Sequence, residues 1–174
     1  MHGHESAERA YKSAERAYKL IRRWQYPDGS TRPCEMVDSP HWTVALLVKL
    51  AVLRRDVPVV QRGVKYLMET IGSESGPLMR VLHCLDPQSN DREPKFEGWP
   101  WRAGAAAWVE PTVHSINALR LAGGMINDPR IKARIASGQN LIWHQRCRGA
   151  DGTMERALRA RCRSRRIRKP PRSL

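Results

Sequence analysis

The segment Trp42-Thr-Val-Ala-Leu-Leu-Val-Lys-Leu-Ala-Val-Leu53 decides the fold class, because it is apolar on nearly every side of a helix. A helix of that kind is buried among other helices. Asp56 and Pro58 follow it and predict the start of a second, amphipathic helix that stops at Gly72. The sequence therefore predicts a buried inner helix followed by an outer helix.

The same arrangement recurs downstream. Residues 112–122 have a helical apolar pattern, with Pro111 in the first turn and Gly123-Gly124 after the end. Asn127-Asp-Pro129 predicts the cap of a further helix that ends near Trp143. Aligning Thr43-Val44 with Thr112-Val113 gives a repeat spacing of 69 residues. We predict an all-α fold of antiparallel helix pairs.

The amino-terminal stretch carries a tandem heptad, Ser6-Ala-Glu-Arg-Ala-Tyr-Lys12 followed by Ser13-Ala-Glu-Arg-Ala-Tyr-Lys19. Its Glu-to-Lys pairs lie four residues apart in the orientation that stabilises a helix. We expect this helix to end near Trp24, before a turn at Tyr26-Pro-Asp-Gly29. A shorter helix is expected at 77–85 and a loop at 86–101, and no segment has the alternating pattern of a strand.

The basic residues are concentrated at the carboxyl end. The 174 residues include 31 Lys and Arg against 17 Asp and Glu, a formal charge of +14. Residues 155–174 hold nine of these basic residues and one acid. Such a tail is able to bind nucleic acid through phosphate contacts, but it lacks the interleaved aromatic residues on which bases stack. We therefore expect a domain at 1–146 and a basic tail at 147–174, with nucleic-acid binding as a less favoured alternative.

The same composition excludes several other classes. No apolar run approaches the roughly 20 residues that a membrane span needs, and Met1-His-Gly-His-Glu5 lacks the features of a secretory signal. We expect a cytoplasmic protein. The four cysteines, Cys34, Cys84, Cys147 and Cys162, form no CxxC pair, which argues against a disulfide framework or a zinc ribbon. No histidine pair has metal-ligand spacing, so we expect neither a metal nor a cofactor.

Two motifs carry a family resemblance. Arg23-Trp-Gln-Tyr-Pro-Asp-Gly29 and the combination of Gly98-Trp-Pro-Trp101 with Trp108-Val-Glu-Pro-Thr112 resemble the prenyltransferase and squalene-cyclase repeats of α/α-toroid proteins. The likeness extends over about 5–143 and is greatest to uncharacterised bacterial members. It implies inner and outer helices around a cavity that holds isoprenoid chains in the enzymes. A closed ring of six helix pairs needs on the order of 250 to 300 residues, so about three pairs imply an incomplete ring.

The resemblance also supplies candidate site residues. Trp99, Trp101 and Trp108 are candidates for the wall of an isoprenoid cavity, where π faces stabilise carbocations; the alternative is that they pack the repeat. Glu110 is a candidate cavity acid or a partner of the helix dipole, and His114 is a further ligand-binding candidate. The chain lacks the Asp-x-Asp-Asp acid motif of the cyclases and the zinc-ligand motifs of the protein prenyltransferases. We therefore expect no catalysis.

Three functions stay open from sequence alone. The favoured one is a catalytically inactive fragment of a toroid protein of the terpenoid-cyclase type. The second is a small helical module that binds a hydrophobic ligand, such as an isoprenoid, or a partner protein. The third is nucleic-acid binding through the Arg-rich tail. The oligomeric state does not follow from the sequence.

A frameshift near residues 146–149 would explain the unusual tail. Relatives in the toroid family continue into a Gly-Gly-Trp-Asn-Tyr-Gly turn, whereas this chain has Gly149-Ala-Asp-Gly-Thr-Met-Glu155. One permitted coding of these residues, GGG GCG GAT GGA ACT ATG GAA, yields the family turn when it is read two bases later. We expect residues after the shift to be out-of-frame translation.

Sequencing the gene tests this hypothesis. The codons for residues 149–155 should spell Gly-Gly-Trp-Asn-Tyr-Gly in the shifted frame, and the frame should stay open beyond it. Codons that give a different peptide in that frame would eliminate the frameshift.

Overall fold

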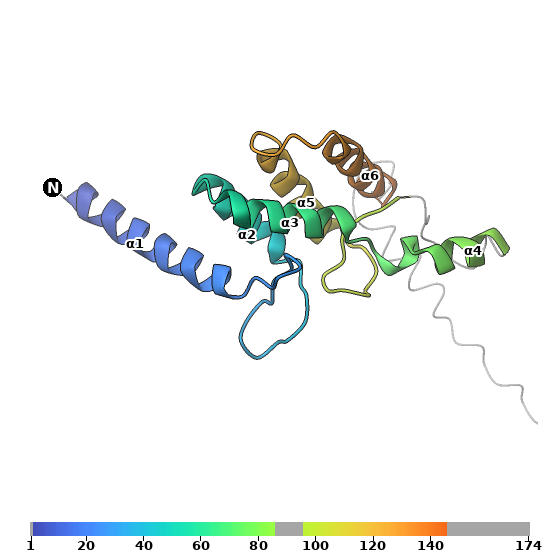
Figure 1. Cartoon of the computed structure of the whole chain (residues 1–174), viewed down its shortest axis with the longest axis horizontal. Coiled ribbons are helices and arrows are strands. Elements are labelled where there is room, and N and C mark those ends of the chain that lie inside the picture. The colour runs from blue at the N-terminus through green and yellow to red at the C-terminus, as the bar shows by residue number, and fades with distance from the viewer. Residues whose placement is uncertain (1, 86–95, 146–174) are drawn as a thin grey trace, which may run out of the picture. The chain divides into compact units, whose positions relative to one another are not determined.

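The computed structural model describes residues 2–85 and 96–145, which form six α-helices and one short 3-10 helix (Figure 1). In chain order these are α1 (His2–Arg23), α2 (Val44–Leu53), α3 (Val57–Glu69), η1 (Ser73–Ser75), α4 (Pro77–Leu85), α5 (Val109–Ala122) and α6 (Arg130–Gln145). Within these ranges β-pairing is limited to isolated bridges, so the all-α prediction is confirmed. The basic tail at 147–174 lies outside the described residues. We describe the compact unit that ends at Ile142.

Helix α2 is the centre of this unit. It packs against both α3 and α5, and the three helices lie side by side (Figure 1). Its buried residues lie on one side of the helix, within about half a turn of its circumference: Val44, Ala45, Leu47, Val48 and Ala51. Leu46, Lys49 and Leu50 are half-buried and Leu53 is exposed, so α2 is buried less completely than its apolar sequence predicts. The predicted helix pair α2–α3 is therefore present, joined by a three-residue connection that reverses the chain.

Burial along the two inner helices defines the repeat more accurately than residue identity does. Val44, Leu47, Val48 and Ala51 of α2 are buried, and so are Ser115, Ala118, Leu119 and Ala122 of α5. These positions correspond at a spacing of 71 residues, which also aligns Pro58 with Pro129. The predicted spacing of 69 is wrong by two residues, because it was set by the Thr-Val pairs at the helix starts, and α5 begins earlier relative to its buried face.

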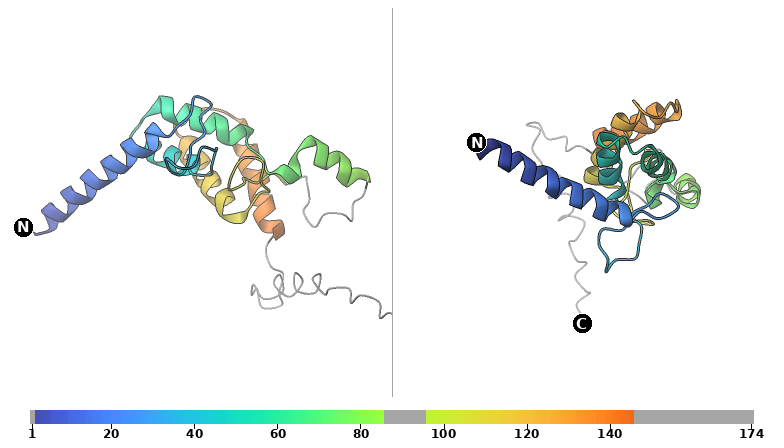
Figure 2. Two further views of the ribbon diagram at one scale, coloured as in Figure 1. Left: turned by 90° about the horizontal axis from the view of Figure 1, so that it is seen from below. Right: turned by 60° about the vertical axis from the view of Figure 1, so that its left-hand side comes forward.

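The connection between α2 and α3 also holds α1. Asp56 occupies the predicted cap position of α3 without a side-chain cap bond. It instead accepts a hydrogen bond from the Tyr18 hydroxyl at 2.7 Å and pairs with Arg22 at 3.3 Å. Burial, followed by the bond to Asp56, raises the pKa of Tyr18. Tyr18 belongs to the second heptad of α1 and Arg22 to the turn after it, so the contacts come from the carboxyl-terminal end of α1, which meets the α2–α3 pair in Figure 2. Residues 8–14 are exposed.

The turn predicted at Asp28-Gly29 is present, and it packs closely against α3. The Gly29 amide donates to the Tyr26 carbonyl at 3.0 Å, and Gly29 has a φ of +91°. A β-carbon at Gly29 would lie 2.0 Å from the carbonyl oxygen of Arg62 in α3. The turn therefore requires glycine for its backbone conformation and for its close approach to the helix.

Trp99 joins the two helix pairs. Its side chain is only 2% exposed, and its indole N–H donates to the Leu67 carbonyl of α3 at 2.8 Å. Its backbone amide donates to the Thr112 hydroxyl of α5 at 3.0 Å. On α6, Gly138 leaves room for the ring, since a β-carbon there would lie 2.7 Å from the Trp99 Cζ3 atom. Three helices therefore contact this one residue, α3 and α6 through its ring and α5 through its backbone amide.

Arg134 of α6 covers the same ring. Its guanidinium carbon lies 3.5 Å from the centre of the Trp99 ring, in a cation–π contact. The guanidinium also donates to the backbone carbonyls of Thr70 at 2.8 Å and of Gly98 at 3.3 Å. Burial lowers the pKa of Arg134 to about 10, so the side chain stays charged at neutral pH. The charge is offset by carbonyl dipoles and the π face.

Substitution of Gly138 tests the role of Trp99. Gly138→Ala should lower the free energy of unfolding by about 1–3 kcal/mol, because the added methyl group overlaps the indole ring. Urea denaturation followed by circular dichroism measures this change.

Gly123→Ala is the matched control. Gly123 follows α5 with φ −58°, and a β-carbon there meets its nearest atoms at 3.4 and 3.5 Å. This control should be neutral or stabilising by up to about 1 kcal/mol. Equal losses in the two variants would contradict the packing described for Trp99.

Candidate functional site

Two loops join at the amino-terminal ends of α2 and α5. His41 forms isolated β-bridges with Thr31 and with Arg102. The Trp42 amide donates to the Trp101 carbonyl at 3.0 Å, and the His41 amide donates to the Thr31 carbonyl at 2.8 Å. Backbone bonds therefore fix the loop before α2 against the loop that precedes α5.

This junction brings three aromatic rings together. The rings of Trp42 and Trp101 meet edge to face, with centroids 5.2 Å apart and an interplanar angle of 87°. The ring of Trp42 also lies over the imidazole of His114, with centroids 4.9 Å apart and an angle of 33°. Both are favourable arrangements for aromatic pairs. The sequence candidates Trp101 and His114 are therefore part of one cluster, with Trp42 between them.

Lys49 extends this cluster along α2. Its ammonium nitrogen lies 3.0 Å from His114 Nδ1 on α5. Burial lowers the pKa of Lys49, and burial followed by the charge of Lys49 lowers the pKa of His114. His114 is therefore neutral at pH 7, and its Nδ1 accepts the hydrogen bond from Lys49. We name Trp42, Lys49, Trp101 and His114 the aromatic–lysine cluster.

Glu110 acts on this cluster from the first turn of α5. Its negative charge raises the pKa of His114 and so opposes the effects of burial and of Lys49. The Glu110 side chain is exposed, and its position at the amino-terminal end of α5 is favourable for a negative charge. The structure thus places Glu110 beside the cluster as an electrostatic neighbour.

The other two sequence candidates lie elsewhere. Trp99 is buried between the helix pairs, where its N–H and its ring have the partners described above. Trp108 is 44% exposed at the start of α5, and its amide donates to the Trp99 carbonyl at 3.1 Å. Trp99 therefore has the packing role weighed as an alternative, and Trp108 lies at the helix boundary.

Sequence reasoning missed two members of the cluster. The sequence pattern predicts a core position for Trp42, together with the apolar segment that it opens, and predicts no role for Lys49. A signal was available for Lys49, since it is the one charged residue in the ten residues of α2, VALLVKLAVL. A lone lysine in an otherwise apolar inner helix indicates that its charge either is paired with another group or has a function in binding or catalysis.

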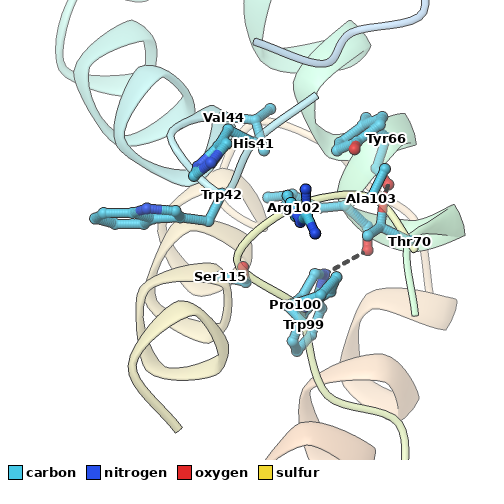
Figure 3. A pocket seen from close by; sticks show the side chains of 11 residues that line it. His41, Trp42, Val44, Tyr66, Thr70, Trp99, Pro100, Arg102, Ala103 and Ser115 are labelled. Atoms are coloured by element: carbon cyan, nitrogen blue, oxygen red, sulfur yellow. Dashed lines mark hydrogen bonds between the residues drawn. The ribbon is translucent and has the colours of Figure 1, made fainter. Parts of the chain in front are cut away.

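A small hollow lies beside these residues, and a larger one lies against α3. The small one, with a volume of about 10 Å³, lies between the loop junction and the helices and is lined by His41, Trp42, Arg102 and Ser115, among others (Figure 3). The larger one is a surface groove of about 310 Å³ between α3 and the start of α6. Its apolar residues are Val64, Met68 and Ile126, and its rim includes the ion pair of Asp128 and Arg130.

Comparisons with known proteins do not assign the chain. No family model, no curated protein and no solved structure matches it. Within residues 2–85 and 96–145, no helix is long and apolar enough to cross a membrane. The same residues contain no group of three His, Cys, Asp or Glu side chains arranged to hold a metal ion.

Acid should weaken the fold through the cluster. The pKa of His114 is lower in the folded state than its ordinary value of 6.5. As the pH falls toward and below 6.5, the unfolded chain therefore binds more protons than the folded chain, and the free energy of unfolding falls with the pH. His114→Asn should reduce the loss of melting temperature between pH 7.5 and pH 5.5.

Lys49→Met is the companion variant, because removing the neighbouring ammonium group raises the pKa of His114 toward its ordinary value. It too should flatten the pH dependence, as measured by differential scanning calorimetry. If both variants keep the wild-type difference in melting temperature, the coupling between Lys49 and His114 is contradicted.

Proposed function

We propose that this chain carries helix pairs of the α/α-toroid type and binds an apolar ligand, such as an isoprenoid, at the aromatic–lysine cluster. The observation that carries the proposal is the contact of Trp42 with both Trp101 and His114 at the seam between α2 and α5. An incomplete toroid with a ligand-binding inner face is what the sequence resemblance implies.

The surroundings of the cluster suit an apolar chain. The two inner helices also carry apolar side chains that are partly or largely exposed: Leu46, Leu50 and Leu53 on α2 and Val113 and Leu121 on α5. Indole rings and leucine side chains offer apolar area whose burial by a ligand is favourable. Lys49 supplies one hydrogen-bond donor for an oxygen at the end of such a ligand.

We propose that the chain binds its ligand without converting it chemically. Cyclisation initiated by protonation requires a carboxylic acid held protonated by its surroundings. Glu110, the carboxylate whose charge acts on His114, is exposed at the start of a helix. The neutral imidazole of His114, bonded to Lys49, is a weak proton donor for an alkene.

Farnesol is the probe for this proposal, with binding measured by the quenching of tryptophan fluorescence and by isothermal titration calorimetry. Trp42→Ala should weaken farnesol binding by about tenfold or more, since loss of a well-packed aromatic contact is worth about 1.4 kcal/mol or more. Trp101→Ala should weaken it by a comparable factor.

Trp143→Ala is the matched control, because Trp143 is 62% exposed near the end of α6. This variant should bind farnesol with the wild-type affinity. If the Trp42→Ala and Trp101→Ala proteins remain folded by circular dichroism and still bind as tightly as the wild type, the proposed site is wrong.

A second candidate function, docking of a partner protein, is favoured by α4. Its apolar side chains Leu78, Val81, Leu82 and Leu85 recur at helical spacing, and all four are at least 45% exposed. An exposed apolar stripe of this kind is typical of a surface that binds another helix. Sedimentation equilibrium of the wild type and of Leu82→Glu shows whether a second copy of the chain uses this stripe.

A further inference from the structure

The small hollow contains two buried polar atoms without a protein partner. The Ser115 side chain of α5 is completely buried, and its hydroxyl oxygen has no hydrogen bond within the described part of the chain. The Nδ1 atom of His41 is also buried and without a partner there. Both residues line the same hollow, and Figure 3 shows the Ser115 oxygen directed into it.

Ser115 departs from the pattern of the repeat. At the spacing of 71 residues its counterpart in α2 is Val44, which lines the same hollow from the other inner helix. Valine at such a position fills space and needs no partner, whereas a buried hydroxyl without a hydrogen bond is costly. The second repeat thus carries a polar group where the first has an apolar one.

His41 is suited to a neutral partner. Burial, and then the charge of Arg102, lower the pKa of His41, so its ring is uncharged at pH 7. A neutral imidazole presents either a donor or an acceptor at Nδ1, according to its tautomer. A hydroxyl group both donates and accepts, so it satisfies His41 in either tautomer and satisfies the Ser115 hydroxyl as well.

The size of the hollow limits its occupant. Its volume of about 10 Å³ corresponds to about one water-sized sphere, the smallest space in which a water molecule is held by polar partners. A carboxylate or phosphate group needs more room. The space therefore admits one oxygen atom with its hydrogen.

We propose that the hollow between His41 and Ser115 is a binding site for one hydroxylic oxygen, supplied by a water molecule or by the terminal hydroxyl of an alcohol. The bound oxygen bridges Ser115 Oγ and His41 Nδ1 and thereby ties the loop before α2 to α5. His41 directly precedes Trp42, so the bridge also positions the Trp42 side of the aromatic–lysine cluster.

The sign of a stability change tests this site. Ser115→Ala removes one partner of the bridge and should lower the melting temperature by about 2–4 °C. In a hollow without a bound oxygen the same change removes an unpaired buried hydroxyl, so the melting temperature would stay the same or rise.

A double-mutant cycle shows whether the two residues share one oxygen. His41→Leu combined with Ser115→Ala should cost less than the sum of the two single changes, because each breaks the same bridge. His41→Asn is the matched control, since its amide reaches about the position of Nδ1 and should keep most of the wild-type stability. Additive losses would overturn the proposal.

Two further measurements identify the source of the oxygen. A high-resolution crystal structure without added ligand should show a water peak about 3 Å from both atoms if water is the occupant. If an alcohol is the occupant, 1-hexanol should raise the melting temperature of the wild type but not that of Ser115→Ala. A hollow with no density, together with no specific effect of hexanol, would overturn the proposal.

Discussion

The burial of one indole ring holds this helical unit together. Trp99 comes from a loop, yet its ring N–H binds the last turn of α3, its amide binds α5, and its ring fills the space left by a glycine of α6. Arg134 covers one face of the ring and donates a hydrogen bond to the Thr70 carbonyl. Because the outer helices α3 and α6 both contact this ring, a change in its packing alters the relative positions of the two helix pairs.

The candidate site depends on that placement. The loop that contains Trp99 continues to Trp101, whose carbonyl holds Trp42 and whose ring meets the ring of Trp42. His114 and Lys49 then bond across the seam between α5 and α2. A buried structural tryptophan and an aromatic binding surface are therefore adjacent in the chain: Trp99 sets the loop, and two residues later Trp101 contributes to the site.

Much of the fold could be predicted from sequence, because it depends on local patterns. The apolar segment of α2, the turn at Gly29 and the prolines at 58 and 129 each specify a helix or its end within a few residues. The sequence could not predict which tryptophan packs the core and which belong to the aromatic–lysine cluster. These roles depend on contacts between distant segments, such as Trp99 with Leu67 and Trp42 with Trp101. The predicted repeat spacing is wrong for a related reason: burial, which is a tertiary property, sets the register of the two inner helices. The toroid resemblance and ligand binding stay predictions.

Nuclear Overhauser effects between bound farnesol and the protein test the proposed site most directly. We predict cross-peaks from the farnesol methyl groups to the indole protons of Trp42 and Trp101. Cross-peaks confined to Val64, Met68 and Ile126, the apolar residues of the groove beside α3, would place the ligand elsewhere and contradict a binding role for the aromatic–lysine cluster.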